Sequence, residues 1–238
     1  MTPPAFLALW NGVLPGWEAE YEAWHSQEHA PERLGAPGFR AARRYRAEAG
    51  AGYFTLYELE GLEALDTPAY MALVREPTLW SARMRPTLTD FRRLPCQTLA
   101  GGCFGRGGAL ATLRLPGQGA PEAVRAVAER AMAEGALLGF LLGEAARLGQ
   151  SYEAFPQARP PEAETLLVLE ASEAGLLPPA VEACRQAWPV GGGEAGFWRA
   201  LQFLRREELP DPSLERQPPR DTLRRHWLCA AEDIVPEG

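Results

Sequence analysis

Short apolar runs alternate in a regular order with helically spaced apolar residues over the first hundred positions. Apolar or alternating runs of about four to eight residues predict strands, whereas apolar residues three to four positions apart predict helices. The predicted elements are a strand at 5–11, a helix at 16–29, strands at 39–48 and 53–60, helices at 67–75 and 78–84, and a strand at 87–100. This β-α-β-β-α-β order is that of a ferredoxin-like unit.

The same order recurs in the second half of the chain. Its predicted elements are strands at 109–115, 137–147, 165–171 and 196–207 and helices at 121–134 and 173–187. Gly139 and Phe140 stand where Gly38 and Phe39 stand in the first half. Two β-α-β-β-α-β units are therefore expected.

Glycine and proline mark the limits of these units. A glycine-rich stretch at 101–108 separates the halves, and the chain becomes proline-rich and polar after Leu209. Such stretches are typical of linkers and loops. We therefore expect a first ferredoxin-like unit at 1–101, a second at 109–208, and a C-terminal tail at 209–238 that lies on the surface.

A single unit of this kind covers one face of its sheet with helices and leaves the other face bare. An exposed sheet face of that size has to be buried against something. Two units in one chain can bury their sheets against each other. The predicted fold class is therefore α+β, with two tandem ferredoxin-like units packed sheet to sheet as an intrachain barrel. Such a chain can be a monomer with an internal pseudo-dimer, or a homodimer.

Composition narrows the classes of function. A net charge of -7 and a pI of about 5.2 argue against a nucleic-acid partner, which needs a basic footprint. No apolar run approaches the roughly 18 residues of a membrane helix, and the N-terminus lacks signal-peptide features, so a cytoplasmic protein is expected. All 24 basic residues are arginine, which excludes lysine Schiff-base chemistry. The four scattered cysteines, which fit free thiols, are Cys96, Cys103, Cys184 and Cys229.

The stretch His25-Ser-Gln-Glu28-His29 matches the H-x-x-E-H signature of inverted zinc metallopeptidases. Histidines four apart share a helix face, so both imidazoles could reach one zinc ion. A zinc site needs a further ligand, however, and the remaining histidine, His226, lies in the tail. Pro31 is also expected to end the helix where such an enzyme would continue it. No metal or other cofactor is therefore expected, and a zinc hydrolase is a remote alternative.

Aromatic, proline and arginine residues form a distinctive arrangement in the first half. It consists of Trp24-x4-His29-x-Pro31-Glu32-Arg33, Pro37-Gly38-Phe39, Arg43-Arg44-Tyr45, Tyr53-x3-Tyr57-Glu58, Pro68-Ala69-Tyr70 and Pro77-Thr78-x-Trp80. This arrangement resembles the dimeric α+β barrel superfamily, and most closely its EthD-like and uncharacterised bacterial members. The likeness covers roughly residues 5–95. The superfamily includes monooxygenases, isomerases, cyclases, haem enzymes and members of unknown role, so the resemblance implies a fold rather than one activity.

His29 is the candidate catalytic residue. It is expected to end its helix just before Pro31, where the helix C-terminus favours an imidazolium. The resemblance implies a position near the cleft between helices and sheet, where His29 would act as an acid or base; the alternative is a structural cap. His25 is expected to be partly exposed, and Glu28 and Glu32 are expected to be surface carboxylates.

Five residues are candidate substrate contacts: Trp10, Trp24, Arg43, Tyr45 and Tyr57. Period-two alternation places Phe39 and Arg43 on the same face of their strand. A buried arginine needs an acidic partner, either Glu58 or Glu60 on the neighbouring strand or an anionic ligand group. Aromatic residues on strands are usually core, although Trp10, near its strand end, could line a pocket mouth.

The leading hypothesis is an enzyme that oxygenates, isomerises or cyclises a small hydrophobic or aromatic molecule without a cofactor. His29 would supply acid/base chemistry, and an arginine or tyrosine from the strands would hold an oxyanion. The alternative is a non-catalytic protein that binds a small molecule or assists a pathway enzyme. The second half has no histidine and mostly aliphatic strands, so the chemistry is expected in the first half. A pocket containing His29 would favour the enzyme.

Overall fold

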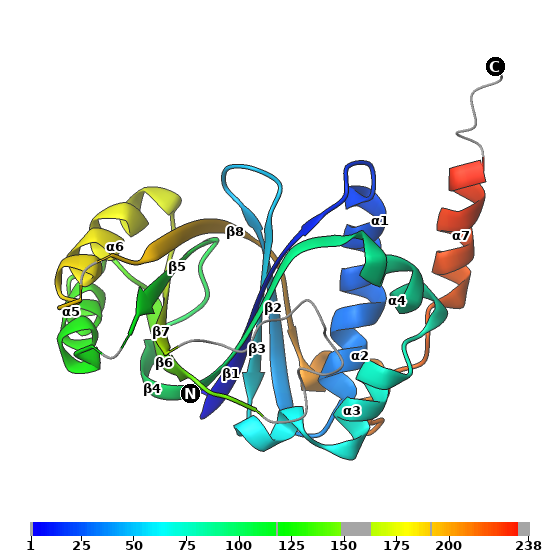
Figure 1. The fold of residues 1–238 in the computed structure, drawn as a ribbon, viewed down its shortest axis with the longest axis horizontal. Helices are drawn as coiled ribbons and strands as arrows, with labels where there is room; N and C mark the ends of the chain where they lie inside the picture. Colours follow the sequence, from blue (N-terminus) through cyan, green and yellow to red (C-terminus); the bar gives the residue numbers. More distant parts are fainter. Residues whose placement is uncertain (1, 118, 149–162, 191, 233–238) are drawn as a thin grey trace.

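The structure is a computed structural model that describes residues 2–117, 119–148, 163–190 and 192–232. The described strands close one antiparallel barrel in the order β1-β3-β2-β8-β5-β7-β6-β4 (Figure 1). The strands are β1 Ala5–Val13, β2 Phe39–Ala47, β3 Tyr53–Leu59, β4 Leu88–Cys103, β5 Ala109–Pro116, β6 Gly139–Ala145, β7 Glu164–Ala171 and β8 Glu194–Arg205. The predicted α+β class, with two β-α-β-β-α-β units in one intrachain barrel, is confirmed.

Each half places its helices outside the barrel, so two helix layers lie on opposite sides of it (Figure 1). The first layer contains α1 Glu18–Trp24, a π-helical turn His25–His29, α2 Ala30–Gly35, α3 Pro68–Arg75 and α4 Leu79–Met84. The second layer contains α5 Pro121–Ala133 and α6 Leu177–Gln186. Thr67 caps α3 by accepting a hydrogen bond from the Tyr70 backbone N–H. Within the described ranges, no helix is long and apolar enough to cross a membrane.

Two strand pairs, β2–β8 and β4–β6, join the halves. The strands β4 and β8 are long because the first segment of each pairs with a strand of its own half and the following segment pairs with a strand of the other half. Since β4 extends to Cys103, Gly101 and Gly102 belong to a strand rather than to the expected linker. A Cβ at Gly101 would come within 2.7 Å of the Thr2 side chain, so glycine permits close chain approach there. The unit limits at 101 and 109 stay a prediction.

The first helical segment does not end before Pro31. It passes through the π-helical turn and continues as α2 to Gly35, so the expected helix end is wrong. The Ala30 backbone N–H donates to the carbonyl of His25, five residues back. This wider turn accommodates Pro31, which has no N–H to donate and would clash in a regular helix interior.

The barrel interior is packed at mid-height and polar at both ends. Its central cluster consists of Phe6, Ala8, Tyr45, Phe54, Leu56, Leu94, Cys96, Leu110, Leu141, Leu166, Val168 and Trp198. Interiors of small barrels are filled by side chains in this way. Space for a ligand inside the barrel is therefore expected at its ends.

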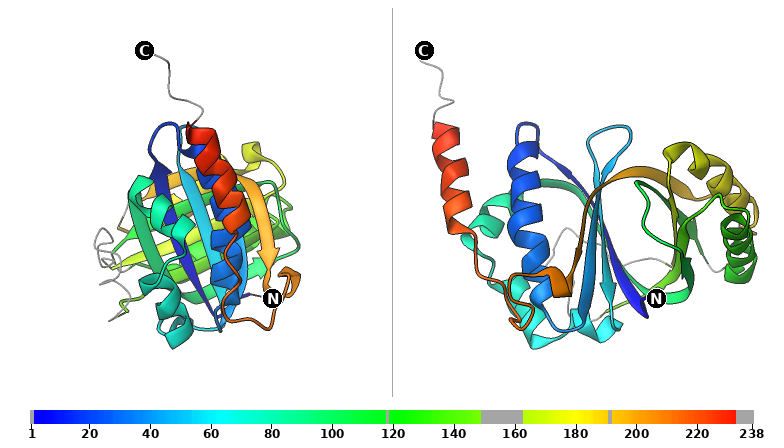
Figure 2. Two further views of the ribbon diagram at one scale, coloured as in Figure 1. Left: turned by 90° about the vertical axis from the view of Figure 1, so that its right-hand side faces the viewer. Right: turned by 180° about the vertical axis from the view of Figure 1, so that it is seen from behind.

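From Leu209 to Glu232 the chain runs along the outside of the first helix layer and contains a helix that the sequence did not predict, α7 Asp221–Glu232. This helix stands beside α1 and α4 at the edge of the first helix layer (Figures 1 and 2). Leu223 and Trp227 pack against the aromatic cluster around Trp24 and Trp80. The helix thus has an apolar face that only the assembled first layer can cover.

Candidate functional site

The π-helical turn holds both histidines of the HSQEH stretch between the first helix layer and the barrel. Their ring centroids are 5.0 Å apart. The His29 ring lies 4.4 Å from Trp24, and the His25 ring lies 5.4 Å from Tyr21. His25 is buried rather than partly exposed as expected, whereas His29 keeps some exposed surface. Turns of this kind are rare and are frequently found at functional sites.

Two arginines place their charges near these rings and near the Tyr57 hydroxyl. The histidine cluster, as we name it, consists of His25, His29, Arg33, Arg44 and Tyr57. Within the residues that the structure describes, His25 Nδ1, His29 Nδ1, Arg33 Nη1 and the Tyr57 hydroxyl are buried without a hydrogen-bond partner. The charge of Arg33 acts on both His29 and Tyr57. Buried polar atoms are nearly always paired, so four such atoms make this cluster a candidate site for a polar ligand group.

Both histidines of the cluster are neutral near pH 7. Burial lowers the pKa of His29 well below its usual value, and the charge of Arg33 lowers it further. Burial likewise lowers the pKa of His25, and Arg44 adds to this effect. The expected imidazolium at a helix C-terminus is therefore wrong, because the helix continues and the nearby side-chain charges are positive.

Tyr57 completes the cluster as a hydrogen-bond donor. Burial raises the pKa of its hydroxyl, so the proton stays on the oxygen at any physiological pH. A neutral imidazole can accept a proton, while a protonated phenol and a guanidinium can donate hydrogen bonds to a developing anion. The cluster thus combines a base with two kinds of anion-stabilising donor.

Glu28 and Glu32 are buried, and the expectation of surface carboxylates is wrong for both. Glu28 accepts hydrogen bonds from the Thr78 hydroxyl at 2.6 Å and from the Arg220 backbone N–H at 2.7 Å. Glu32 forms an ion pair with Arg216 at 3.0 Å. Both carboxylates therefore attach the C-terminal tail to the helices that carry the histidines.

Two of the predicted substrate contacts lie on the same side of the barrel wall as His29, between the sheet and the first helix layer. Tyr57 belongs to the histidine cluster, and the Trp24 indole N–H donates to Ser81 Oγ at 3.2 Å. Three others lie on the inner face of the barrel, away from the histidines: Trp10, Arg43 and Tyr45. The structure therefore divides the five predicted contacts between two regions.

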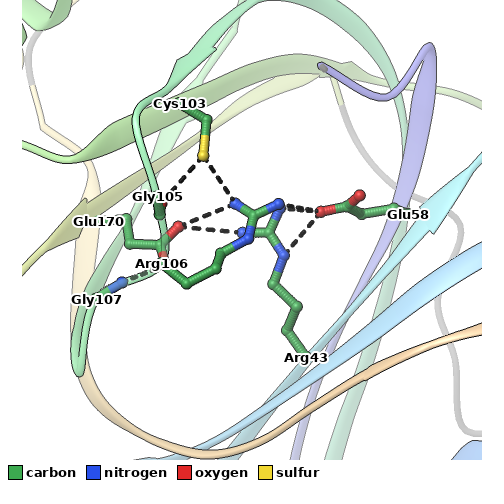
Figure 3. Close-up of polar contacts among 7 residues, drawn as sticks. All are labelled: Arg43, Glu58, Cys103, Gly105, Arg106, Gly107 and Glu170. Atoms are coloured by element: carbon green, nitrogen blue, oxygen red, sulfur yellow. Dashed lines mark hydrogen bonds and ion pairs between the residues drawn. The ribbon is translucent and has the colours of Figure 1, made fainter. Parts of the chain in front are cut away.

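Arg43 lies at one end of the barrel among carboxylates. Its Nε donates to Glu58 at 2.8 Å, which confirms the predicted cross-strand ion pair, and its Nη1 lies 3.3 Å from Glu170. Arg106, from the connection between β4 and β5, bridges the same two carboxylates at 2.9 and 3.2 Å (Figure 3). We call these four residues the closed end. Glu170 lies 127 positions from Arg43, so no local sequence pattern indicated their contact.

The alternation predicted for β2 is interrupted at its start. The register of β2 against β3 shifts between Phe39 and Ala41, as in a β-bulge. Phe39 consequently packs on the helix side, with its ring centroid 5.2 Å from that of Tyr70, while Arg43 faces the barrel interior. The prediction that Phe39 and Arg43 share a face is wrong, because one inserted residue reverses the side-chain orientation beyond it.

The other end of the barrel opens into a pocket of about 1600 Å³, which we call the mouth pocket. Trp10 lines it, and so do Trp198, Arg92, Arg114 and Glu164. The second half thus supplies charged and aromatic groups that the expectation of a first-half site did not foresee. Among the lining residues in the described ranges, neither histidine of the cluster is present.

The HSQEH histidines find no third metal ligand in the part of the chain that the structure describes. No three His, Cys, Asp or Glu side chains in those ranges are grouped so that they could hold a metal ion. The remaining histidine, His226, is exposed on α7. The geometry therefore does not support the zinc-hydrolase alternative.

Comparisons with known proteins show the fold. No family model matches the chain, and no curated protein does. An anthrone oxidase-like protein superposes with a TM-score of 0.58 at 10% identity, over 86% of this chain and 95% of that one. A candidate monooxygenase of Fusobacterium nucleatum gives 0.57 at 9% identity, over 86% and 96%. A candidate chlorite dismutase gives 0.50 at 12% identity, over 85% and 96%. The chain therefore has the dimeric α+β barrel fold.

Proposed function

We propose that this protein is a cofactor-independent enzyme that acts on a small, partly aromatic molecule at the histidine cluster. One observation carries the proposal. A neutral His29, whose buried Nδ1 has no partner among the described residues, lies close to Arg33, whose Nη1 is also buried and unpaired. A neutral base beside a fixed positive charge suits removal of a proton and stabilisation of the anion that results.

The roles follow from the protonation states. His29 accepts a proton from carbon, while Arg33 and the Tyr57 hydroxyl donate hydrogen bonds to the oxyanion that forms. Proton removal beside a carbonyl is a first step that cofactor-free oxygenation, isomerisation and cyclisation can share. The cluster therefore supports this step more directly than it supports any one product.

The similarity to an anthrone oxidase-like protein suggests a test compound. Anthrone has a methylene group whose deprotonation delocalises negative charge onto the ketone oxygen. The anion can react with dioxygen to give anthraquinone and water, one oxygen atom going to each product. The two hydrogens of the methylene leave with the water, so no further reductant is required.

The sequence-predicted substrate contacts are assigned accordingly. Trp24 and Tyr57 border the proposed active site. Trp10 belongs to the mouth pocket, and we treat Arg43 and Tyr45 as structural members of the barrel interior. The aromatic and arginine arrangement in the first half supports kinship with EthD-like proteins, and the repeated order of elements supports an origin by tandem fusion.

A non-catalytic binding protein is the second candidate. The observation that favours it is the dense aromatic packing around His29, whose ring lies 4.4 Å from Trp24. The mouth pocket, by contrast, has room for a ligand but offers no histidine among its described lining residues. A protein that only binds its ligand would use that pocket and leave the histidines unreactive.

The proposal is tested by measuring dioxygen consumption and anthraquinone formation with anthrone. Wild type is compared with His29→Gln, Tyr57→Phe and the control His226→Gln, whose histidine is exposed on α7. Because general-base catalysis typically contributes about 100-fold or more, His29→Gln is expected to lower the rate by at least that factor. Tyr57→Phe is expected to cause a smaller loss, and the control none.

Folding is checked in every variant by near-ultraviolet circular dichroism. Equal anthrone rates in wild type and a folded His29→Gln variant would contradict the assignment of the base. A wild type that never exceeds the protein-free rate, with anthrone and with enolisable aromatic ketones generally, would favour the binding protein.

A further inference from the structure

The mouth pocket is a second candidate site, separate from the histidine cluster. Its volume of about 1600 Å³ exceeds the roughly 300–1,000 Å³ of common small-molecule sites. Strands of both halves form its walls, since β1 and β4 belong to the first half and β5, β7 and β8 to the second. The pocket therefore exists only because the two units close into one barrel.

Two tryptophans, Trp10 and Trp198, line the pocket. The buried ring of Phe54 lies behind them, with its centroid 5.0 Å from that of Trp10 and 5.5 Å from that of Trp198. The Trp198 indole N–H donates to Thr112 Oγ1 at 3.0 Å, which fixes that ring in place. Adjoining rings of this kind provide an apolar surface on which a flat ligand ring can pack.

Two arginines lie beside Trp10. Arg92 lies directly opposite Trp10 in the β1–β4 pair, and the Arg114 guanidinium lies 6.0 Å from the Trp10 ring centroid. The register between these strands shifts between Trp10 and Gly12, and Asp90 at this point has a φ of 50°. Bulges often reorient side chains beside binding sites. The aromatic and cationic groups of the pocket are thus adjacent.

The two guanidiniums share a single buried carboxylate. Glu164 accepts from Arg92 Nη2 at 2.5 Å and from Arg114 Nε at 3.2 Å. The other partner of Arg114 is Glu194, at 2.7 Å, whose side chain is 75% exposed. Arg92 Nε is buried without a partner in the described part of the chain. Arg92 Nε can therefore donate a hydrogen bond to a ligand anion, and Arg114 can do so when the anion displaces Glu194.

We infer that the mouth pocket binds an aromatic carboxylate. The ligand ring packs on Trp10 and Trp198, and the carboxylate accepts hydrogen bonds from Arg92 and Arg114. Planar guanidiniums match carboxylates in geometry, so two of them beside an aromatic surface select this class over neutral aromatics. Glu48 and Asp90 also border the pocket, so selection comes from the placement of the guanidiniums rather than from net charge.

The experiment is isothermal titration calorimetry of the full chain with 1-naphthoate, and with 1-naphthamide as the neutral comparator. Wild type is compared with Arg92→Gln and Arg114→Gln. The matched control is Arg125→Gln, an exposed arginine on α5 that pairs with Glu129. We expect 1-naphthoate to bind wild type at least tenfold more tightly than 1-naphthamide. Each pocket variant should weaken naphthoate binding at least tenfold, and the control should leave it unchanged.

Three results would overturn the inference: no heat with wild type up to the solubility limit of 1-naphthoate, equal binding of the amide, or unchanged binding in both pocket variants. The variant His29→Gln separates this site from the proposed active site. Naphthoate binding is expected to survive that substitution. Its loss there would place the ligand at the histidine cluster, which would refute the inference about the pocket and leave the proposed enzyme standing.

Discussion

The two ends of the barrel contain the same kinds of charged side chains and differ in how those charges are balanced. At the closed end, Arg43 and Arg106 bridge two carboxylates, Glu58 and Glu170, around a space of about 20 Å³. At the mouth, two arginines share one buried carboxylate, Glu164, and face about 1600 Å³, while the second carboxylate, Glu194, is exposed. A buried arginine requires an acidic partner. Where buried carboxylates supply every partner the end is structural, and where one partner is an exposed carboxylate a ligand can displace it.

The largest expected effect comes from breaking the closed end. Glu58→Leu leaves the guanidiniums of Arg43 and Arg106 with Glu170 alone in a buried environment. Removing one partner of a buried ion pair typically costs about 3–5 kcal/mol, so the free energy of unfolding should fall by that amount. Urea unfolding measures it, with Glu207→Leu as the control, because the Arg205–Glu207 pair is exposed and should contribute under about 1 kcal/mol. A loss for Glu58→Leu no larger than the control's would show that the closed end is not structural.

The histidine cluster should change the stability of the fold over a different pH range from that of the carboxylates at the barrel ends. The folded-state pKa values of His25 and His29 lie below the ordinary 6.5, so the unfolded chain binds more protons below that pH. Stability should therefore fall as the pH drops below about 6.5, by up to about 1.4 kcal/mol per pH unit for each histidine. The slope is obtained from the midpoint of urea unfolding, measured at pH values from 7.5 to 5. A His25→Gln/His29→Gln double variant should flatten it, and an unchanged slope would refute the buried neutral state.

Glu58 marks a separate pH window. Burial acts to raise its pKa, but the charges of Arg43 and Arg106 and the hydrogen bond from Arg43 together outweigh burial, and the folded-state pKa lies below the ordinary 4.5. The stability that it contributes is present above pH 4.5 and is lost as the pH falls further. Glu58→Leu should therefore leave the slope above pH 5 intact and reduce the loss below pH 4.5. A loss of stability that begins below about pH 6.5 thus reports on the histidines of the first helix layer, and a further loss below pH 4.5 reports on the closed end.

The smallest effect is expected at the rim of the mouth. Glu194→Gln removes an exposed partner of Arg114, and exposed ion pairs are worth about 0–1 kcal/mol, so stability should hardly change. The same substitution removes a competitor for the guanidinium and should tighten 1-naphthoate binding by about threefold. Calorimetry measures the difference. Weaker naphthoate binding in this variant would indicate that Glu194 helps to hold the ligand instead of competing with it.

Local pattern in the sequence determined the elements and their order. Helical and alternating periodicities predict most elements of each β-α-β-β-α-β unit to within a few residues, because they depend on neighbours close in the chain. The first helix is the exception, since it continues to Gly35 instead of ending at His29. The burial requirement of two bare sheets then indicates the barrel, and adjacency of β2 and β3 indicates a partner for Arg43 at Glu58 or Glu60, of which the structure has Glu58. These features involve local propensity or sequential strands, so the sequence is sufficient for them.

Tertiary structure alone decided the protonation state of His29, the burial of Glu28 and Glu32, and the division of the arginines between the barrel ends. Burial and the charges of Arg33 and Arg44 make the histidines neutral. Arg33 lies four positions after His29 on the same helical segment, but burial and the charge of Arg44 on β2 act only after helix and sheet have packed. Glu170 and Glu164 meet their arginines across barrel closure, from positions far apart in the chain. Such contacts depend on which strands become neighbours, and no spacing within a local segment encodes that.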